Sequence, residues 1–85
     1  MSAPVDLASQ GDPTYFPTYV AWGWTKFCVA NKGTEEAQVR LQTPKADPEY
    51  LAAGVGAVQC IDRQWGGWTL FVQNERNVPV TVWTS

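Results

Sequence analysis

The C-terminal part of the chain alternates apolar and polar side chains with a period of two, and this alternation restricts it to β structure. Five apolar residues share the even positions: Leu70, Val72, Val78, Val80 and Val82. Because successive side chains of a strand point to opposite faces, all five belong to one face. A three-residue turn at 75–77 keeps that face continuous, whereas a two-residue turn places the valines opposite outward groups. The pattern therefore predicts strands at 68–74 and 78–84, paired as a hairpin.

A second segment of the same design precedes it. Residues 24–31 and 36–42 carry apolar side chains at odd positions on either side of a turn that contains Gly33, which predicts another hairpin. Shifting the sequence by 43 positions superimposes the two segments, with Val29 on Val72 and Asn31 on Asn74. This match indicates two pseudo-repeated halves, roughly 15–42 and 56–85, that form the two sheets of a sandwich.

The remaining segments complete an all-β prediction. Residues 1–12 show no periodicity and are expected to form an arm that is flexible or docked at a sheet edge, followed by a single β domain at 13–85. The one helical signal lies in the crossover at 43–54, where Pro48 suits a first helical position. The expected strands are 15–22, 24–31, 36–42, 56–65, 68–74 and 78–84. About six strands with one short helical turn predict a small antiparallel β-sandwich or a partly closed barrel.

The two cysteines, Cys28 and Cys60, allow two interpretations. A disulfide would close a loop of about 30 residues and stabilise the fold by roughly 3–4 kcal/mol. The alternative is a pair of buried thiols that pack as small apolar side chains. A bridged pair predicts a secreted or extracellular protein, and reduced thiols predict a cytoplasmic one. Residues 1–6 lack a basic region followed by an apolar segment, so we expect either a cytosolic chain or a Met1 added to a processed one.

Composition argues against several classes of function. The chain has no His, which removes the commonest general base and the commonest metal ligand, so we expect no catalysis, no metal site and no cofactor. The net charge is −2 and the six basic residues are scattered, whereas nucleic-acid binders carry a clustered basic face. The longest weakly polar run, Tyr50–Val58, falls far short of the roughly 20 residues that span a bilayer, so no transmembrane segment is expected.

The tryptophans are the candidate binding residues. Two motifs, Trp22-Gly23-Trp24 and Trp65-Gly66-Gly67-Trp68, each place a pair of indoles around glycine where one strand gives way to the next. The hairpin register puts Trp83 on the face opposite the valines, so both faces of several strands are apolar. Polar contacts are expected from neighbouring side chains, above all Gln64 and Arg63. The predicted partner-binding residues are Trp22, Trp24, Trp65, Trp68, Trp83, Gln64 and Arg63.

These residues support a non-catalytic binding or assembly module with three candidate partners. When a sheet is apolar on both faces, the core covers one face and another molecule must cover the other. Another copy of the chain is the simplest such molecule, which predicts a homo-oligomer, a dimer or higher. An indole face also suits a sugar ring or another protein's groove, which predicts a lectin-like module. The third candidate is a membrane surface, where Trp and Tyr prefer to lie. The Trp-Gly and Val-x-Asn motifs resemble those of small β-sandwich lectins and adhesion modules, and no functional residue is carried over from that likeness.

Overall fold

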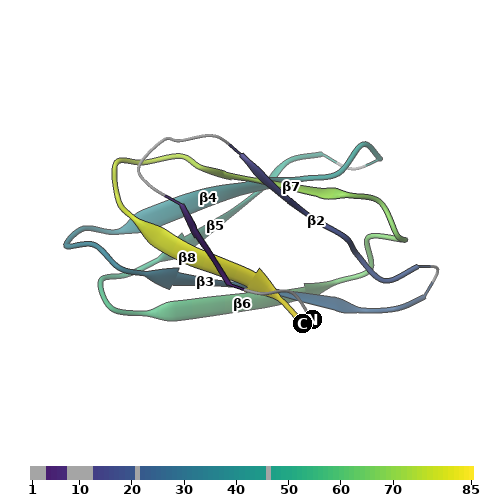
Figure 1. The fold of residues 1–85 in the computed structure, drawn as a ribbon, viewed down its shortest axis with the longest axis horizontal. Coiled ribbons are helices and arrows are strands. Elements are labelled where there is room, and N and C mark those ends of the chain that lie inside the picture. Colours follow the sequence, from purple (N-terminus) through teal and green to yellow (C-terminus); the bar gives the residue numbers. More distant parts are fainter. Residues whose placement is uncertain (1–3, 8–12, 21, 46) are drawn as a thin grey trace.

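The chain folds into two antiparallel four-stranded sheets that pack face to face (Figure 1). The computed structural model describes residues 4–7, 13–20, 22–45 and 47–85. One sheet has the order β1-β8-β3-β6 and the other β2-β7-β4-β5. The eight strands are β1 (Val5–Leu7), β2 (Thr14–Phe16), β3 (Thr25–Asn31), β4 (Ala37–Gln42), β5 (Glu49–Ala53), β6 (Val58–Arg63), β7 (Leu70–Asn74) and β8 (Val80–Thr84). The all-β expectation is confirmed, with eight strands in place of about six.

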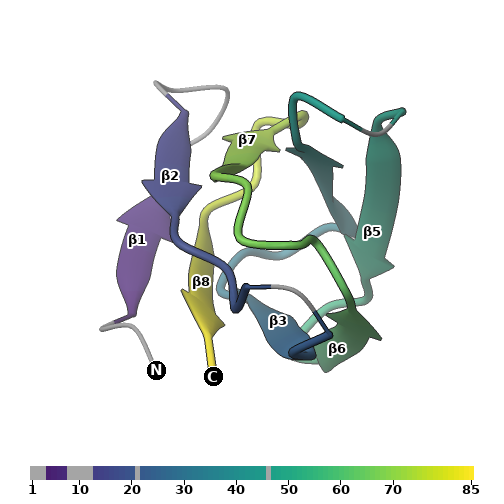
Figure 2. The ribbon, with the colours of Figure 1, turned by 90° about the vertical axis from the view of Figure 1, so that its right-hand side faces the viewer.

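The core lies between the sheets, where the two inward faces meet (Figure 2). The predicted inward residues are the buried ones: Phe27, Val39, Leu70, Val72 and Val82 are each exposed by 0%. On β4 and β7 burial alternates residue by residue, as a strand with one solvated face requires. The period of two therefore assigned the faces of these strands correctly.

The pairing of these strands differs from the prediction, because neither expected hairpin forms. β7 pairs with β4 and β2, whereas β8 pairs with β3 and β1, so the turn at 75–79 carries the chain from one sheet to the other. The turn at 32–36 does the same between β3 and β4. Both are arches in which the apolar faces meet across the core rather than side by side. Alternation fixes which face a residue occupies, and it is the same in a hairpin and in an arch.

The two arches share one pattern of hydrogen bonds, which an asparagine side chain makes to the arch backbone. Asn31 Oδ1 accepts from the backbone N–H of Gly33 at 2.8 Å, and its amide donates to the carbonyl of Glu35 at 2.6 Å. Asn74 repeats both bonds at the same spacing, from Arg76 N–H at 3.1 Å and to the carbonyl of Val78 at 2.7 Å. Both asparagines are buried, so they satisfy arch backbone groups that no strand ladder reaches.

The pseudo-repeat appears in the topology as well as in the arches. The segment β3–β4 corresponds to β7–β8, and β3 pairs with β8 while β4 pairs with β7, as two halves related by a two-fold exchange would. The registers differ: Val29 lies opposite Val82, whereas its equivalent Val72 lies opposite Leu41. The slip amounts to two residues, which keeps every side chain on its own face.

The helical turn expected within 43–54 is wrong. Glu49–Ala53 forms β5 instead, paired with β4 in a register that sets Ala37 opposite Ala53 and Val39 opposite Leu51. A helix of one turn is an unfavourable nucleus on its own, while the free edge of β4 offers this segment a ladder of hydrogen bonds. Tertiary pairing therefore overrides the local capping signals.

Part of the predicted N-terminal arm is described by the structure, and the first predicted strand is shorter than expected. Within residues 1–12, Val5–Leu7 forms β1 at the edge of its sheet, where Val5 lies opposite Val82, and residues 8–12 lie outside the described part of the chain. The strand expected at 15–22 is confined to β2, and residues 17–20 continue as loop.

The cysteines are bridged, as one of the two interpretations predicted. Cys28 of β3 and Cys60 of β6 lie directly opposite each other, with their Cα atoms 4.1 Å apart and 32 residues between them in sequence. β6 is an edge strand whose residues are all exposed or half-buried. The covalent link therefore holds a strand that buries little apolar surface, and a loop of this length corresponds to roughly 3–4 kcal/mol of stability.

Candidate functional site

A set of exposed apolar side chains is carried by two loops at one end of the molecule. The ribbon of these loops lies at the right of Figure 1. The set comes from the β2–β3 loop and the β6–β7 loop, and we call it the apolar tip. Its residues and exposed fractions are Trp22 84%, Val20 74%, Trp24 60%, Tyr19 50% and Trp68 44%. Neither 17–24 nor 64–69 contains a charged residue in the sequence. Exposed large apolar side chains on two neighbouring loops make this end a candidate interaction site.

The two loops of the apolar tip are held together by hydrogen bonds. Thr18 Oγ1 donates to the carbonyl of Trp68 at 2.7 Å, which joins one loop to the other. The Tyr19 N–H donates to Thr25 Oγ1 at 3.0 Å. Each loop also closes on itself, through Gly23 N–H to Val20 carbonyl at 3.0 Å and Trp68 N–H to Trp65 carbonyl at 3.2 Å. The tip therefore has a defined shape in which these backbone groups are already satisfied.

Gly67 lets the two loops approach closely. Its φ of +83° lies in the left-handed region that favours glycine. A Cβ at this position would lie 2.9 Å from Val20 Cγ1 and 3.4 Å from Val20 Cα. Gly67 is thus required by the contact with the neighbouring loop, and Gly66, whose φ is +64°, by the turn itself.

The other two tryptophans lie outside the apolar tip surface. Trp65 is 8% exposed and belongs to the hydrophobic core, so it supports the tip from beneath. Trp83 of β8 is half-buried and lies opposite Cys28 on the outer face of the β1-β8-β3-β6 sheet. The structure thus joins the two loops that carry Trp22, Trp24 and Trp68, whereas Trp83 lies within a strand. Lys45 places its Nζ 5.2 Å from the ring centroid of Trp68 and is the cation nearest that ring among the contacts of the described residues.

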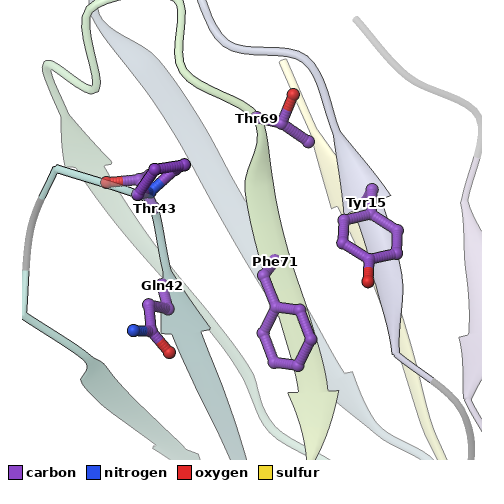
Figure 3. A pocket seen from close by; sticks show the side chains of 6 residues that line it. Tyr15, Gln42, Thr43, Thr69 and Phe71 are labelled. Carbon is purple, nitrogen blue, oxygen red and sulfur yellow. The ribbon is translucent and has the colours of Figure 1, made fainter.

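A second surface, which the sequence reasoning missed, lies on the outer face of the β2-β7-β4-β5 sheet (Figure 3). It is an open hollow of about 270 Å³ over Phe71. The register sets Phe71 between Tyr15 on β2 and Gln42 on β4, so the three side chains form one row across the sheet. The hollow is lined by Tyr15, Gln42, Thr43, Pro44, Thr69 and Phe71. The row is invisible in sequence because it joins three strands that are far apart in the chain.

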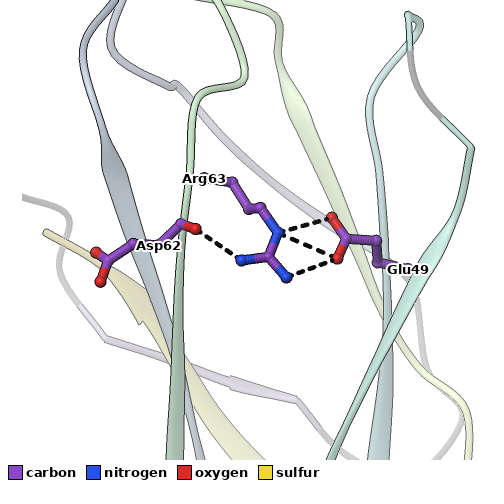
Figure 4. Close-up of polar contacts among 3 residues, drawn as sticks. All are labelled: Glu49, Asp62 and Arg63. Carbon is purple, nitrogen blue, oxygen red and sulfur yellow. Dashed lines mark hydrogen bonds and ion pairs between the residues drawn. The ribbon is translucent and has the colours of Figure 1, made fainter.

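The two polar residues predicted to assist binding are engaged within the protein. Gln64 Nε2 donates to the carbonyl of Trp22 at 2.8 Å and so joins the two loops of the apolar tip. The Arg63 guanidinium forms an ion pair with Glu49, Nη2 to Oε2 at 3.2 Å, and donates from Nη1 to the carbonyl of Asp62 at 2.7 Å (Figure 4). Since Arg63 is on β6 and Glu49 on β5, the pair connects the edge strands of the two sheets.

Comparison with known protein families gives one match, to the model of DUF8244, a family of unknown function, over residues 5–85. The chain belongs to the DUF8244 family. No curated protein and no solved structure matched it. The family match covers every strand of the fold and both arches, and it assigns no activity to any residue.

Among residues 4–7, 13–20, 22–45 and 47–85, no group of three or more metal-binding side chains from His, Cys, Asp and Glu comes together. In the same described residues, no helix has the length and apolar character needed to cross a membrane.

Proposed function

We propose that this DUF8244 protein is a non-catalytic binding module that attaches to a lipid surface through its apolar tip. The observation that carries the proposal is the exposure of three indoles, a phenol and a valine on two uncharged loops at one end of the molecule. Trp and Tyr are the residues most enriched where hydrocarbon meets lipid headgroups, since their rings are apolar with one polar group.

The backbone of the tip supports insertion into such a surface. A loop that enters an apolar medium must satisfy its own N–H and C=O groups, because water no longer does so. The tip loops make these bonds internally, including those from Gln64 to Trp22 and from Thr18 to Trp68. Lys45 beside Trp68 is placed where its ammonium group can reach the headgroups while its aliphatic stem stays in contact with the ring.

A second copy of the chain, the partner expected first from the sequence, fits the tip less well. The molecule measures 38 × 19 × 19 Å, so its end is about 19 Å across in each direction. A flat section about 19 Å on each side is less than half of the roughly 800 Å² that stable interfaces bury on each partner. The chain exposes 4898 Å², close to the roughly 5,000 Å² expected of a monomer of its mass, so its core closes without a second copy.

A glycan at the tip is also less well supported. Sugar recognition combines an aromatic face with polar groups that bind hydroxyls, and the two predicted polar groups are already bonded to Trp22, Glu49 and Asp62. The disulfide favours an oxidising compartment such as the outside of a cell. The lipid surface that a protein meets there is the outer leaflet of the membrane.

Binding to lipid vesicles tests the proposal. The disulfide-bonded protein is mixed with phosphatidylcholine vesicles and the bound fraction is measured by flotation. Covering an exposed indole contributes on the order of 2–4 kcal/mol at about 25 cal/mol per Å². Trp22→Ser is therefore expected to weaken partitioning at least about tenfold, and Trp22→Ser with Trp24→Ser is expected to abolish it.

Tyr50→Ser is the matched control, because Tyr50 is 56% exposed on the outer face of a sheet, away from the tip. This variant is expected to float like the unmodified protein. The proposal fails if the protein does not float, or if Tyr50→Ser and Trp22→Ser have equal effects. Sedimentation without vesicles tests whether the tip binds a second copy of the chain instead. If the unmodified protein is an oligomer and Trp22→Ser is a monomer, the tip serves self-association and the lipid proposal is overturned.

A further inference from the structure

The hollow over Phe71 combines an aromatic wall with polar groups, which the apolar tip does not. Tyr15 packs edge-on against Phe71 with ring centroids 5.7 Å apart and an interplanar angle of 71°. Tyr15 is 60% exposed, so one side of its ring and its hydroxyl face solvent. Across the row stands Gln42, and Thr69 lies at the end of the hollow with its hydroxyl directed away from Phe71 (Figure 3).

The amide of Gln42 is oriented by a neighbouring arginine. Arg40 Nη2 donates to Gln42 Oε1 at 2.7 Å, which occupies the carbonyl side of the amide. The NH₂ group of Gln42 donates to no other residue that the structure describes, and it points to the side of Gln42 away from Phe71 (Figure 3). Its two N–H groups therefore lie at the rim of the hollow. Arg40 Nε is itself buried and, within the described residues, has no acceptor.

We propose that this hollow binds one ring of a neutral glycan. The inference goes beyond lipid attachment, since the hollow lies on the outer face of a sheet and the tip at its end. The C–H face of a pyranose stacks on the Tyr15 ring above Phe71, because an aromatic face attracts polarised C–H bonds and excludes water from them. The Gln42 NH₂ group at the rim donates to a ring hydroxyl, and the Tyr15 hydroxyl exchanges a hydrogen bond with another.

The size and charge of the hollow restrict the ligand to this class. A volume of about 270 Å³ lies just below the range of pockets that enclose drug-sized ligands, so the site accommodates a single ring and leaves the rest of a chain in solvent. No residue that lines it is charged. The positive charge nearest to Gln42, that of Arg40, is occupied with the Gln42 carbonyl, which favours a neutral sugar over an acidic one.

The test is titration of ¹⁵N-labelled protein with the methyl glycosides of glucose, galactose, mannose, N-acetylglucosamine and glucuronic acid, followed by NMR. At least one neutral glycoside is expected to saturate in the millimolar range and to shift the Gln42 side-chain NH₂ together with the backbone of Thr69 and Phe71. Gln42→Met keeps the side-chain length and removes both donors, and is expected to weaken binding at least fivefold. Tyr15→Ala is expected to abolish it.

Tyr50→Ala is the matched control, since Tyr50 lies on the same sheet face, is similarly exposed and does not line the hollow. It is expected to bind like the unmodified protein, and dispersed spectra confirm that each variant is folded. The proposal is overturned if no neutral glycoside saturates, if the glucuronide binds more tightly, or if Tyr50→Ala matches Tyr15→Ala. It is also overturned if the shifts fall on the indole N–H groups of Trp22 and Trp24, which would place sugar at the tip. Vesicle flotation is independent of all these results.

Discussion

The two ends of the molecule differ in the number of charged residues that their loops contain. The end that carries the arches at 32–36 and 75–79 has five charged residues in those turns, whereas the apolar tip loops have none. Arg76 forms an ion pair with Glu36 at 3.6 Å between the two arches, and the Lys32 N–H donates to the carbonyl of Pro79 at 3.0 Å. The arch turns bury Val78 and expose charged side chains, whereas the tip loops expose Trp22, Trp24 and Val20.

If the tip binds lipid as proposed, stability and attachment should depend on different residues. At the arch end the buried groups, Asn31 and Asn74, satisfy backbone that the fold requires. At the tip the most exposed groups, Trp22 and Val20, contribute nothing to the core and add exposed apolar surface. Changes at the arch end should therefore lower stability without altering attachment, and changes to the tip surface should do the reverse.

The largest effect on stability is expected from Asn31→Ala. It removes donors to the carbonyls of Glu35 and Ala53 and the acceptor for the Gly33 N–H. Leaving these buried groups without partners costs about 2–3 kcal/mol, or roughly 10–20 °C in thermal midpoint for a domain of this size. Asn77→Ala, an exposed change in the other arch, is the control and should stay within about 0.5 kcal/mol. Thermal unfolding by circular dichroism measures both, and equal midpoints for the two variants would contradict the role assigned to Asn31.

A smaller effect on stability is expected from Gly67→Ala, which should also weaken binding to vesicles. The positive φ and the short distance to Val20 predict a loss of about 1–2 kcal/mol and a displaced tip loop that floats less well with vesicles. Gly54→Ala is the control at the arch end, since a Cβ there would meet no atom within 4 Å. If the two alanine variants have the same stability and flotation, the close approach of the two loops does not matter.

The smallest effect is expected from Arg63→Ala. The side chains of Arg63 and Glu49 are 47% and 40% exposed, and ion pairs of this kind contribute less than about 1 kcal/mol and weaken with salt. Chemical unfolding at low and high ionic strength should show a difference that nearly vanishes at high salt, with flotation unchanged. A large, salt-independent loss would mean that the pair holds the sheet edges more firmly than its exposure indicates.

The sequence predicts the faces of the strands better than their partners. The apolar side chains at even positions of 70–82 and at odd positions of 27–41 are inward as expected, because alternation depends only on local geometry. Hairpin and arch place the same residues inward, so the pairing of β3 with β8 and of β7 with β4 depends on long-range contacts. For the same reason β5 could not be distinguished from a short helix.

The sequence likewise predicts some features of the candidate site and not others. The Trp-Gly motifs located the apolar tip, since glycine between large rings indicates a loop that approaches another closely. They did not predict that Trp65 is buried and Trp68 exposed, because that depends on how Gly66 and Gly67 turn the chain. The row of Tyr15, Phe71 and Gln42 required the order of three strands, which no local pattern contains.

The most direct test of the central claim is quenching of tryptophan fluorescence by lipids brominated along their acyl chains. The account predicts that vesicles containing these lipids quench the emission and shift it to shorter wavelengths, and that Trp22→Ser with Trp24→Ser removes most of the quenching. Emission that is the same with brominated and ordinary vesicles, at protein and lipid concentrations where flotation is measured, would show that the indoles of the apolar tip do not enter the lipid.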